Sequence, residues 1–127
     1  DSLGWLQNEF HLAPAEFQRI RQLHDGYQTR CGEICRTIAE RNRELQLLLG
    51  STNNAPALVE KKLQEIAALR AECQAGMLRH FQEVAASMPP AEGRRYLAEM
   101  SRLTLETHGR IEAEMSPDAH ESHVHSP

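Results

Sequence analysis

Apolar residues recur at helical spacing along two long stretches of the chain. The first runs from Pro14 to Leu49 and the second from Pro56 to about Ser87, and no proline interrupts either of them. A proline suits the first turn of a helix, where its missing N–H would have no partner in any case. Between the stretches, residues 50–54 read Gly-Ser-Thr-Asn-Asn, a composition typical of a turn. The pattern therefore predicts two long helices joined by a short loop.

Shorter patterns flank the two long helices. Residues 2–11 carry four large apolar side chains and predict a short helix or arm that lies on a larger body. Met88-Pro89-Pro90 ends the second long helix, and apolar residues from Ala91 to about Met115 can line one face of a further helix. We expect one all-α domain over residues 1–115. It is a hooked antiparallel helical hairpin of four helices, two long and two short, and residues 116–127 form a disordered tail.

The two long helices can be aligned through their apolar seams. Positions that advance by alternating three and four residues present one apolar face on each helix. If the loop folds the helices antiparallel about Thr52, residues whose numbers sum to about 104 face each other. This register predicts the pairs Ile20 with Val84, His24 with His80, Tyr27 with Met77, Cys31 with Cys73, Ile38 with Ile66, and Leu45 with Val59. Two of these pairs carry metal-ligating side chains, and they lie one heptad apart.

The three cysteines are candidates for a covalent link. Cys31 and Cys35 lie one helical turn apart, with Cβ atoms at roughly 5 to 6 Å, whereas a disulfide needs about 3.8 Å. Cys31 and Cys73 face each other in the register, so we expect a disulfide between them, which implies an oxidising compartment. Two alternatives stay open: three reduced, buried thiols, or a soft metal bound by all three sulfurs.

The histidines are candidates for a metal site. Buried imidazole nitrogens without hydrogen bonds cost on the order of 1 to 3 kcal/mol each, and one metal ion would satisfy both His24 and His80. Glu83, one turn after His80, adds a carboxylate, and this mixture of donors suits zinc, copper, nickel or cobalt. The alternative is a pair of core histidines satisfied by protein partners. A secondary, weaker metal site is predicted in the tail, at His120, His123 and His125.

Composition argues against several classes of function. The 14 basic and 18 acidic residues are spread along the chain and give a net charge of -4, so no basic stripe is present to bind nucleic acid. No run of about 18 apolar residues is present, so we expect no membrane insertion. Because the chain also lacks a glycine-rich phosphate loop, a His-Glu-x-x-His motif and a nucleophile with its base, we expect no enzymatic activity.

Several short motifs, spread over residues 3 to about 100, carry a resemblance to a known family. They are Trp5-Leu6-x-x-Glu9-Phe10-x-Leu12, Leu23-His24-x-x-Tyr27, Cys31-x-x-x-Cys35, Cys73, Met77-Leu78-x-His80-Phe81, Met88-Pro89-Pro90 and Arg94-Arg95-Tyr96-Leu97. In their order and spacing the chain resembles the periplasmic heavy-metal sensor family, which includes the Cnr-type nickel and cobalt sensor and is more distantly related to the Spy, CpxP and ZraP chaperone-like proteins. The resemblance implies a hooked four-helix hairpin that forms a homodimer, lies in the periplasm or is tethered to the inner membrane, and responds to metal.

The resemblance also implies positions for ligands. The nickel and cobalt sensor binds its ion through two histidines of the first helix, a glutamate of the second, and a histidine and a methionine of the third. In this chain His24 stands at the glutamate position and His80 at the histidine position. Leu3 and Gln7 stand at the two N-terminal histidine positions, and Val84 stands at the methionine position.

These observations together predict a non-catalytic periplasmic regulator of heavy-metal resistance. It would bind or sense a metal and signal through a metal-dependent conformation to a membrane-bound partner such as an anti-sigma factor. The alternative function is that of a Spy-like or CpxP-like periplasmic chaperone, which would hold unfolded clients on the concave apolar face of a dimer without a specific metal. A structural hairpin that only dimerises is a third interpretation.

Overall fold

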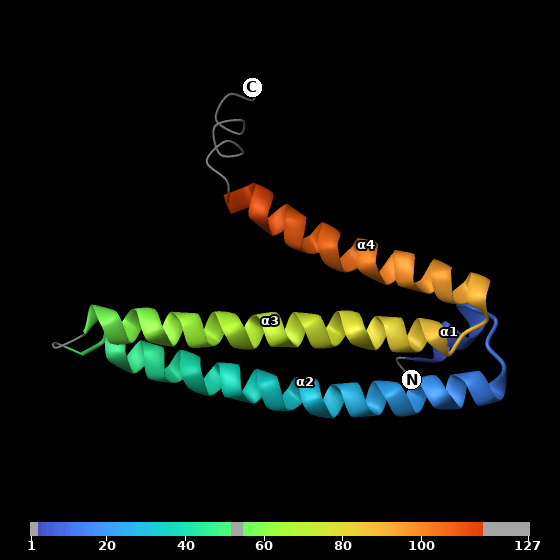
Figure 1. The fold of residues 1–127 in the computed structure, drawn as a ribbon, viewed down its shortest axis with the longest axis horizontal. Coiled ribbons are helices and arrows are strands. Elements are labelled where there is room, and N and C mark those ends of the chain that lie inside the picture. Colours follow the sequence, from blue (N-terminus) through green and yellow to red (C-terminus); the bar gives the residue numbers. More distant parts are fainter. Residues whose placement is uncertain (1–2, 52–54, 116–127) are drawn as a thin grey trace, which may run out of the picture.

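The structure, a computed structural model, describes residues 3–51 and 55–115, with side chains described as far as residue 106. Within these ranges the chain forms four helices, α1 (Gly4–Glu9), α2 (Pro14–Leu49), α3 (Pro56–Ala86) and α4 (Pro90–Met115), and no strand. Helices α2 and α3 run side by side as a long hairpin, α1 lies at the end opposite the loop, and α4 leaves that same end and diverges from the hairpin (Figure 1). The prediction of an all-α hooked hairpin is therefore confirmed.

Local chemistry explains where the helices begin and end. Helices α2, α3 and α4 each begin with a proline. Before α2, Ala13 is extended and its backbone N–H donates to Glu16 Oε1 at 2.8 Å, which satisfies an amide at the start of the helix. The bounds predicted for α4, Ala91 to about Met115, agree with the structure, but at 26 residues it is not the short helix that we expected, and Gly93 and Gly109 do not interrupt it. In the described ranges, no helix combines the length and the apolar character that crossing a membrane requires.

The apolar core lies at the end of the hairpin where all four helices meet. Its buried members are Leu3, Leu6, Phe10, Leu12, Phe17, Ile20, Val84, Met88 and Tyr96. Ile20 and Val84, from the two long helices, are the most deeply buried, each 1% exposed. The rings of Phe10 and Tyr96 pack edge to face with centroids 5.5 Å apart and join α1 to α4. Further along the hairpin, burial falls to isolated positions such as Ile66.

Arg95 ties α1 to α4 beside this core. Its Nη2 donates to the carbonyl oxygen of Glu9, the last residue of α1, at 2.6 Å, and its Nη1 donates to Glu9 Oε1 at 3.1 Å. The guanidinium also lies over the Phe10 ring, 4.2 Å from the centroid, and pairs with Glu92. Because carbonyls at the C-terminus of a helix lack intrahelical partners, Arg95 satisfies one of them while it holds the short helix in place.

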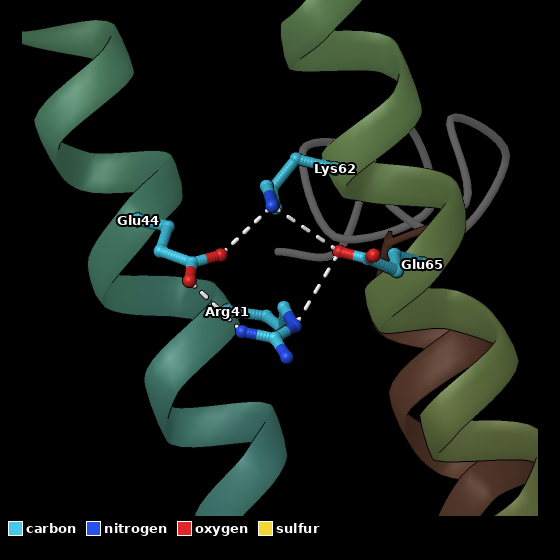
Figure 2. A network of polar contacts seen from close by, with 4 residues as sticks. All are labelled: Arg41, Glu44, Lys62 and Glu65. Carbon is cyan, nitrogen blue, oxygen red and sulfur yellow. Dashed lines mark hydrogen bonds and ion pairs between the residues drawn. The ribbon is translucent and has the colours of Figure 1, made fainter.

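A ring of ion pairs links α2 to α3 toward the loop (Figure 2). Glu44 binds Lys62 at 2.8 Å and Arg41 at 2.9 Å, and Glu65 binds Lys62 at 3.3 Å and Arg41 at 3.5 Å. The hydrogen bond from Lys62 is the main reason that the pKa of Glu44 is lowered. Such partly exposed pairs stabilise a fold only modestly, but their alternation fixes the register where the apolar core is absent.

Helices α3 and α4 approach each other closely at Gly93. A Cβ atom at this position would lie 2.3 Å from the carbonyl oxygen of Ala85 in α3, far inside van der Waals contact. The neighbour is backbone, so it cannot rotate away. Gly93 therefore sets the distance at which α4 packs on the hairpin.

We predict that Gly93→Ala destabilises the protein by about 1 to 3 kcal/mol, because the added methyl group forces α4 away from Ala85. Urea unfolding followed by circular dichroism measures this change. The matched control is Gly32→Ala in α2, where a Cβ would meet no atom within 4 Å. That substitution should stabilise the helix by about 0.5 to 1 kcal/mol. Equal stabilisation by both substitutions would contradict the close approach.

Candidate metal centre

A cavity of about 430 Å³ lies between α2 and α3, next to the core end of the hairpin. Of the five predicted site residues that lie in the described ranges, four line it: Cys31 from α2, and Cys73, His80 and Glu83 from α3. His24 is not part of the lining, but its ring lies 5.8 Å from that of His80, centroid to centroid. The predicted register thus brings the two histidines together and the two cysteines together.

His80 is buried and only partly satisfied. It is 5% exposed, its ring stacks on Tyr27 with centroids 4.4 Å apart, and its Nδ1 has no hydrogen-bond partner in the part of the chain that the structure describes. Burial lowers the pKa of His80, and the proximity of His24 lowers it further. The imidazole is therefore held in its neutral form, which is the form that binds metals.

The spacing of the two imidazoles suits a single ion. With metal–nitrogen bonds of 2.0 to 2.1 Å, each ring centre lies about 3.2 Å from the ion, so two rings lie about 5 to 6 Å apart. The observed separation of 5.8 Å falls in this interval. Glu83 is an exposed side chain on the cavity wall. The ligand atoms of His24, His80 and Glu83 do not all lie within 4.8 Å of one another, so side chains would have to rotate for the three to bind one ion.

Two of the three family positions that carry no ligand here, Leu3 and Val84, lie in the core. Leu3 and Val84 are both buried, at 9% and 1% exposure, in the cluster that joins α1 to the hairpin. Glu9 of α1 is held by Arg95 instead of facing the histidines. The short first helix therefore contributes Leu6 to the core and Glu9 to the contact with Arg95.

The three cysteines form a compact cluster one heptad further along the hairpin. Cys31 Sγ lies 3.9 Å from Cys35 Sγ and 4.0 Å from Cys73 Sγ, and all three sulfurs lie within 4.8 Å of one another. Cys31 and Cys73 are half-buried and Cys35 is exposed, and all three are free thiols. The sulfurs that we expected to be bonded are thus neighbours without the bond of about 2.05 Å, and the disulfide stays a prediction.

Tyr27 connects the cysteine cluster to the histidines. Its ring stacks on His80, while burial, followed by a hydrogen bond with Cys31, raises the pKa of Tyr27 to about 12. The register placed Tyr27 opposite Met77 instead. A helical side chain leans toward the N-terminus of its own helix, which carries the Tyr27 ring to the level of His24 and His80. A register based on residue numbers alone does not include this direction of the side chain.

The pKa values of two of the thiols, those of Cys73 and Cys35, are raised. Burial, followed by the hydrogen bond with Cys31, raises the pKa of Cys73, and the hydrogen bond with Cys31 is the main cause that raises the pKa of Cys35. Uncoordinated, these sulfurs are therefore weak nucleophiles. The predicted tail site at His120, His123 and His125 lies outside the described residues and stays a prediction.

Comparison with known proteins identifies the family. The chain matches a family model described as heavy-metal resistance over residues 4–95, which is more than half of its 127 residues. The chain therefore belongs to this family, as the resemblance of its motifs indicated. No curated protein and no solved structure matched the chain.

We predict that His80 makes the metal-free protein sensitive to mild acid. Its pKa is lowered in the folded state, so the unfolded chain takes up the proton first as the pH falls. The contribution of neutral His80 to the free energy of unfolding is therefore complete above pH about 6.5, and it is lost as the pH falls below this value. Urea unfolding with a chelator, at neutral and at mildly acidic pH, should show a smaller loss for His80→Phe than for the unmodified chain.

The control for this measurement is His11→Asn, at an exposed position on the turn between α1 and α2 whose positive φ of 52° asparagine tolerates. This variant should lose as much stability as the unmodified chain. An equal loss in His80→Phe would show that the protonation of His80 has no part in acid sensitivity.

Proposed function

We propose that this member of the heavy-metal resistance family is a non-catalytic, periplasmic metal sensor that binds a divalent transition-metal ion between α2 and α3. The observation that carries the proposal is the buried His80, whose Nδ1 has no partner among the described residues and whose ring faces His24 at 5.8 Å. A bound ion would supply the missing partner to a ring that is already neutral. Zinc, copper, nickel and cobalt all accept imidazole, and Glu83 supplies a carboxylate on the cavity wall, one helical turn from His80.

The position of the histidines supports a sensing role. His24 and His80 lie one helical turn from Ile20 and Val84, the two most deeply buried residues of the core. One ion bound to both imidazoles would fix the separation of α2 and α3 at this level. Because packed cores shift between discrete arrangements and do not deform smoothly, such a constraint would reach the side chains of α1 and α4 that share the core.

Helix α4 is the element best placed to carry the signal outward. It begins at the core and then diverges from the hairpin, so a small rotation at its base would displace its far end by a larger distance (Figure 1). Periplasmic location, tethering to the inner membrane and a membrane-bound partner such as an anti-sigma factor are supported by the resemblance to the periplasmic metal sensors. They form the remaining part of this proposal.

We predict that a chain truncated after Met115, which lacks the tail histidines, binds one zinc, copper, nickel or cobalt ion. Mutation of a residue that only hydrogen-bonds to a metal ligand typically weakens metal binding about 10- to 100-fold. Loss of a ligand itself should cost more, so we expect His24→Ala and His80→Ala each to lower the affinity at least about 100-fold. Isothermal titration calorimetry measures both effects. The control is Gln22→Ala, which changes a polar side chain on the wall of the same cavity.

Two outcomes would remove this proposal. Either the truncated chain binds none of the four ions, or it binds them equally well without both histidines. In that event the chaperone function becomes the better explanation, and metal-independent suppression of client aggregation would support it.

We also propose that the protein is a homodimer, because several large apolar side chains remain exposed. Trp5 is 50% exposed on α1, and Leu103 and Leu105 of α4 are 46% and 56% exposed. A second copy would cover such groups. Light scattering at micromolar concentration should give twice the chain mass of 14.4 kDa. A mass of 14.4 kDa at micromolar concentrations would contradict the dimer.

A further inference from the structure

The three cysteines offer a donor set of a different chemical class from the histidines. Cys31, Cys35 and Cys73 bring three sulfurs together within 4.8 Å. In the described part of the chain, no imidazole or carboxylate comes within that range of all three. A ligand bound here would therefore meet sulfur alone from these residue types.

The spacing of the sulfurs matches the coordination of one ion. Three sulfurs placed symmetrically in a plane around a metal, with bonds of about 2.3 Å, lie about 4.0 Å apart, and in a tetrahedral arrangement they lie about 3.8 Å apart. The two measured separations from Cys31 are 3.9 and 4.0 Å. An ion could bind at the centre of the cluster with little movement of either helix.

The helical geometry explains why the cluster forms. Cys31 and Cys35 are four residues apart on α2, so they share one face, and Cys73 approaches them from α3 in the same register that pairs the histidines. Two ligands thus come from one helix and one from the other, so a bound ion would also join the two helices.

The donor set selects the class of ion. Thiolates favour soft ions, and zinc, which is bound in closed sites by four ligands, would need a fourth donor that this cluster does not offer among its histidine, cysteine and carboxylate neighbours. Cu(I) is a soft closed-shell ion that accepts three ligands. We propose that Cys31, Cys35 and Cys73 form a second metal site that holds one soft, thiophilic cation, with Cu(I) as its representative, in a three-coordinate environment.

Binding is an exchange of protons for metal without any change in oxidation state. One Cu(I) ion and three thiols give one tris-thiolate complex of charge -2 and release three protons to the buffer. Because Cys35 is exposed, the ion can reach the cluster from solvent, while Cys31 and Cys73 lie on the wall of the cavity. A disulfide between Cys31 and Cys73 would consume two of the three ligands, so the covalent link and this site exclude each other.

The site is separate from the one proposed for His24 and His80. The clusters lie one heptad apart, or about 10 Å along the helices, and Tyr27 stands between them. The inference goes beyond the proposed function and does not require the histidines to hold a metal. An experiment can therefore refute either proposed metal site without refuting the other.

The test is Cu(I) binding by the full chain, fully reduced and kept free of oxygen. Cu(I) is supplied as its coloured bicinchoninate complex, so that transfer to the protein is read from the loss of colour. We expect one equivalent to transfer and an ultraviolet sulfur-to-copper charge-transfer band to appear, which reports sulfur coordination directly. Cys35→Ser should remove the band and lower the affinity at least about 100-fold.

The controls separate this site from alternatives. Cys35 is exposed, so Cys35→Ser should keep the helical circular dichroism spectrum, and Cys31→Ser and Cys73→Ser should reproduce its effect on binding. His24→Ala should leave Cu(I) affinity and the band unchanged. Unchanged affinity in Cys35→Ser would reveal a two-sulfur site and overturn the proposal. It would also be overturned if no equivalent transferred, or if Cu(I) were lost in His24→Ala with all three thiols intact.

Discussion

The antiparallel register of α2 against α3 is the constraint on which the rest of the structure depends. It is anchored where Ile20 and Val84 lie in the common core, at 1% exposure each. Once that level is fixed, helical periodicity places His24 beside His80 one turn further and Cys31 beside Cys73 two turns beyond. A shift of α3 by one residue would rotate its side chains by about 100° and separate both pairs at once. The two candidate sites therefore depend on packing at one end of the molecule, supplemented by the ion pairs around Lys62.

Much of this arrangement could be predicted from the sequence, because its determinants are local and repetitive. Prolines mark the first residue of three helices, and the bounds predicted for α2 agree with those of the structure. The alternating spacing of apolar residues gave the register that brings both special pairs together. The direction of individual side chains was harder to predict than the helices and their register. The stacking of Tyr27 on His80 follows from the lean of a long side chain, and the approach of Cys35 to Cys31 depends on the rotamers of both. The close approach of Gly93 to Ala85 could not be foreseen, because it depends on how α4 packs on α3 and leaves no mark in the local sequence pattern.

The hairpin contains two donor sets that suit different metals. Imidazoles with a nearby carboxylate match ions of intermediate hardness, whereas three sulfurs match soft ions. Tyr27 lies between them, stacked on His80 and in contact with Cys31. Metal binding at either donor set would therefore act on the Tyr27 ring. If both sites are occupied in turn, the influence of one on the other must be reciprocal, since coupling between two binding equilibria is a property of the pair.

The sparse core would give metal binding a large effect on conformation. Outside the end where four helices meet, α2 and α3 form a layer only two helices thick, and few of their side chains are fully buried. Domains of this size are stable by about 5 to 15 kcal/mol in total. A ligand that binds only the folded form at 100 times its dissociation constant adds about 2.7 kcal/mol, a substantial part of that total. An ion bound between the long helices would therefore act where few buried side chains hold the two helices together. This is the part of the hairpin where a modest binding energy can decide the separation of the helices, and α1 and α4 lie against the adjoining core that would respond.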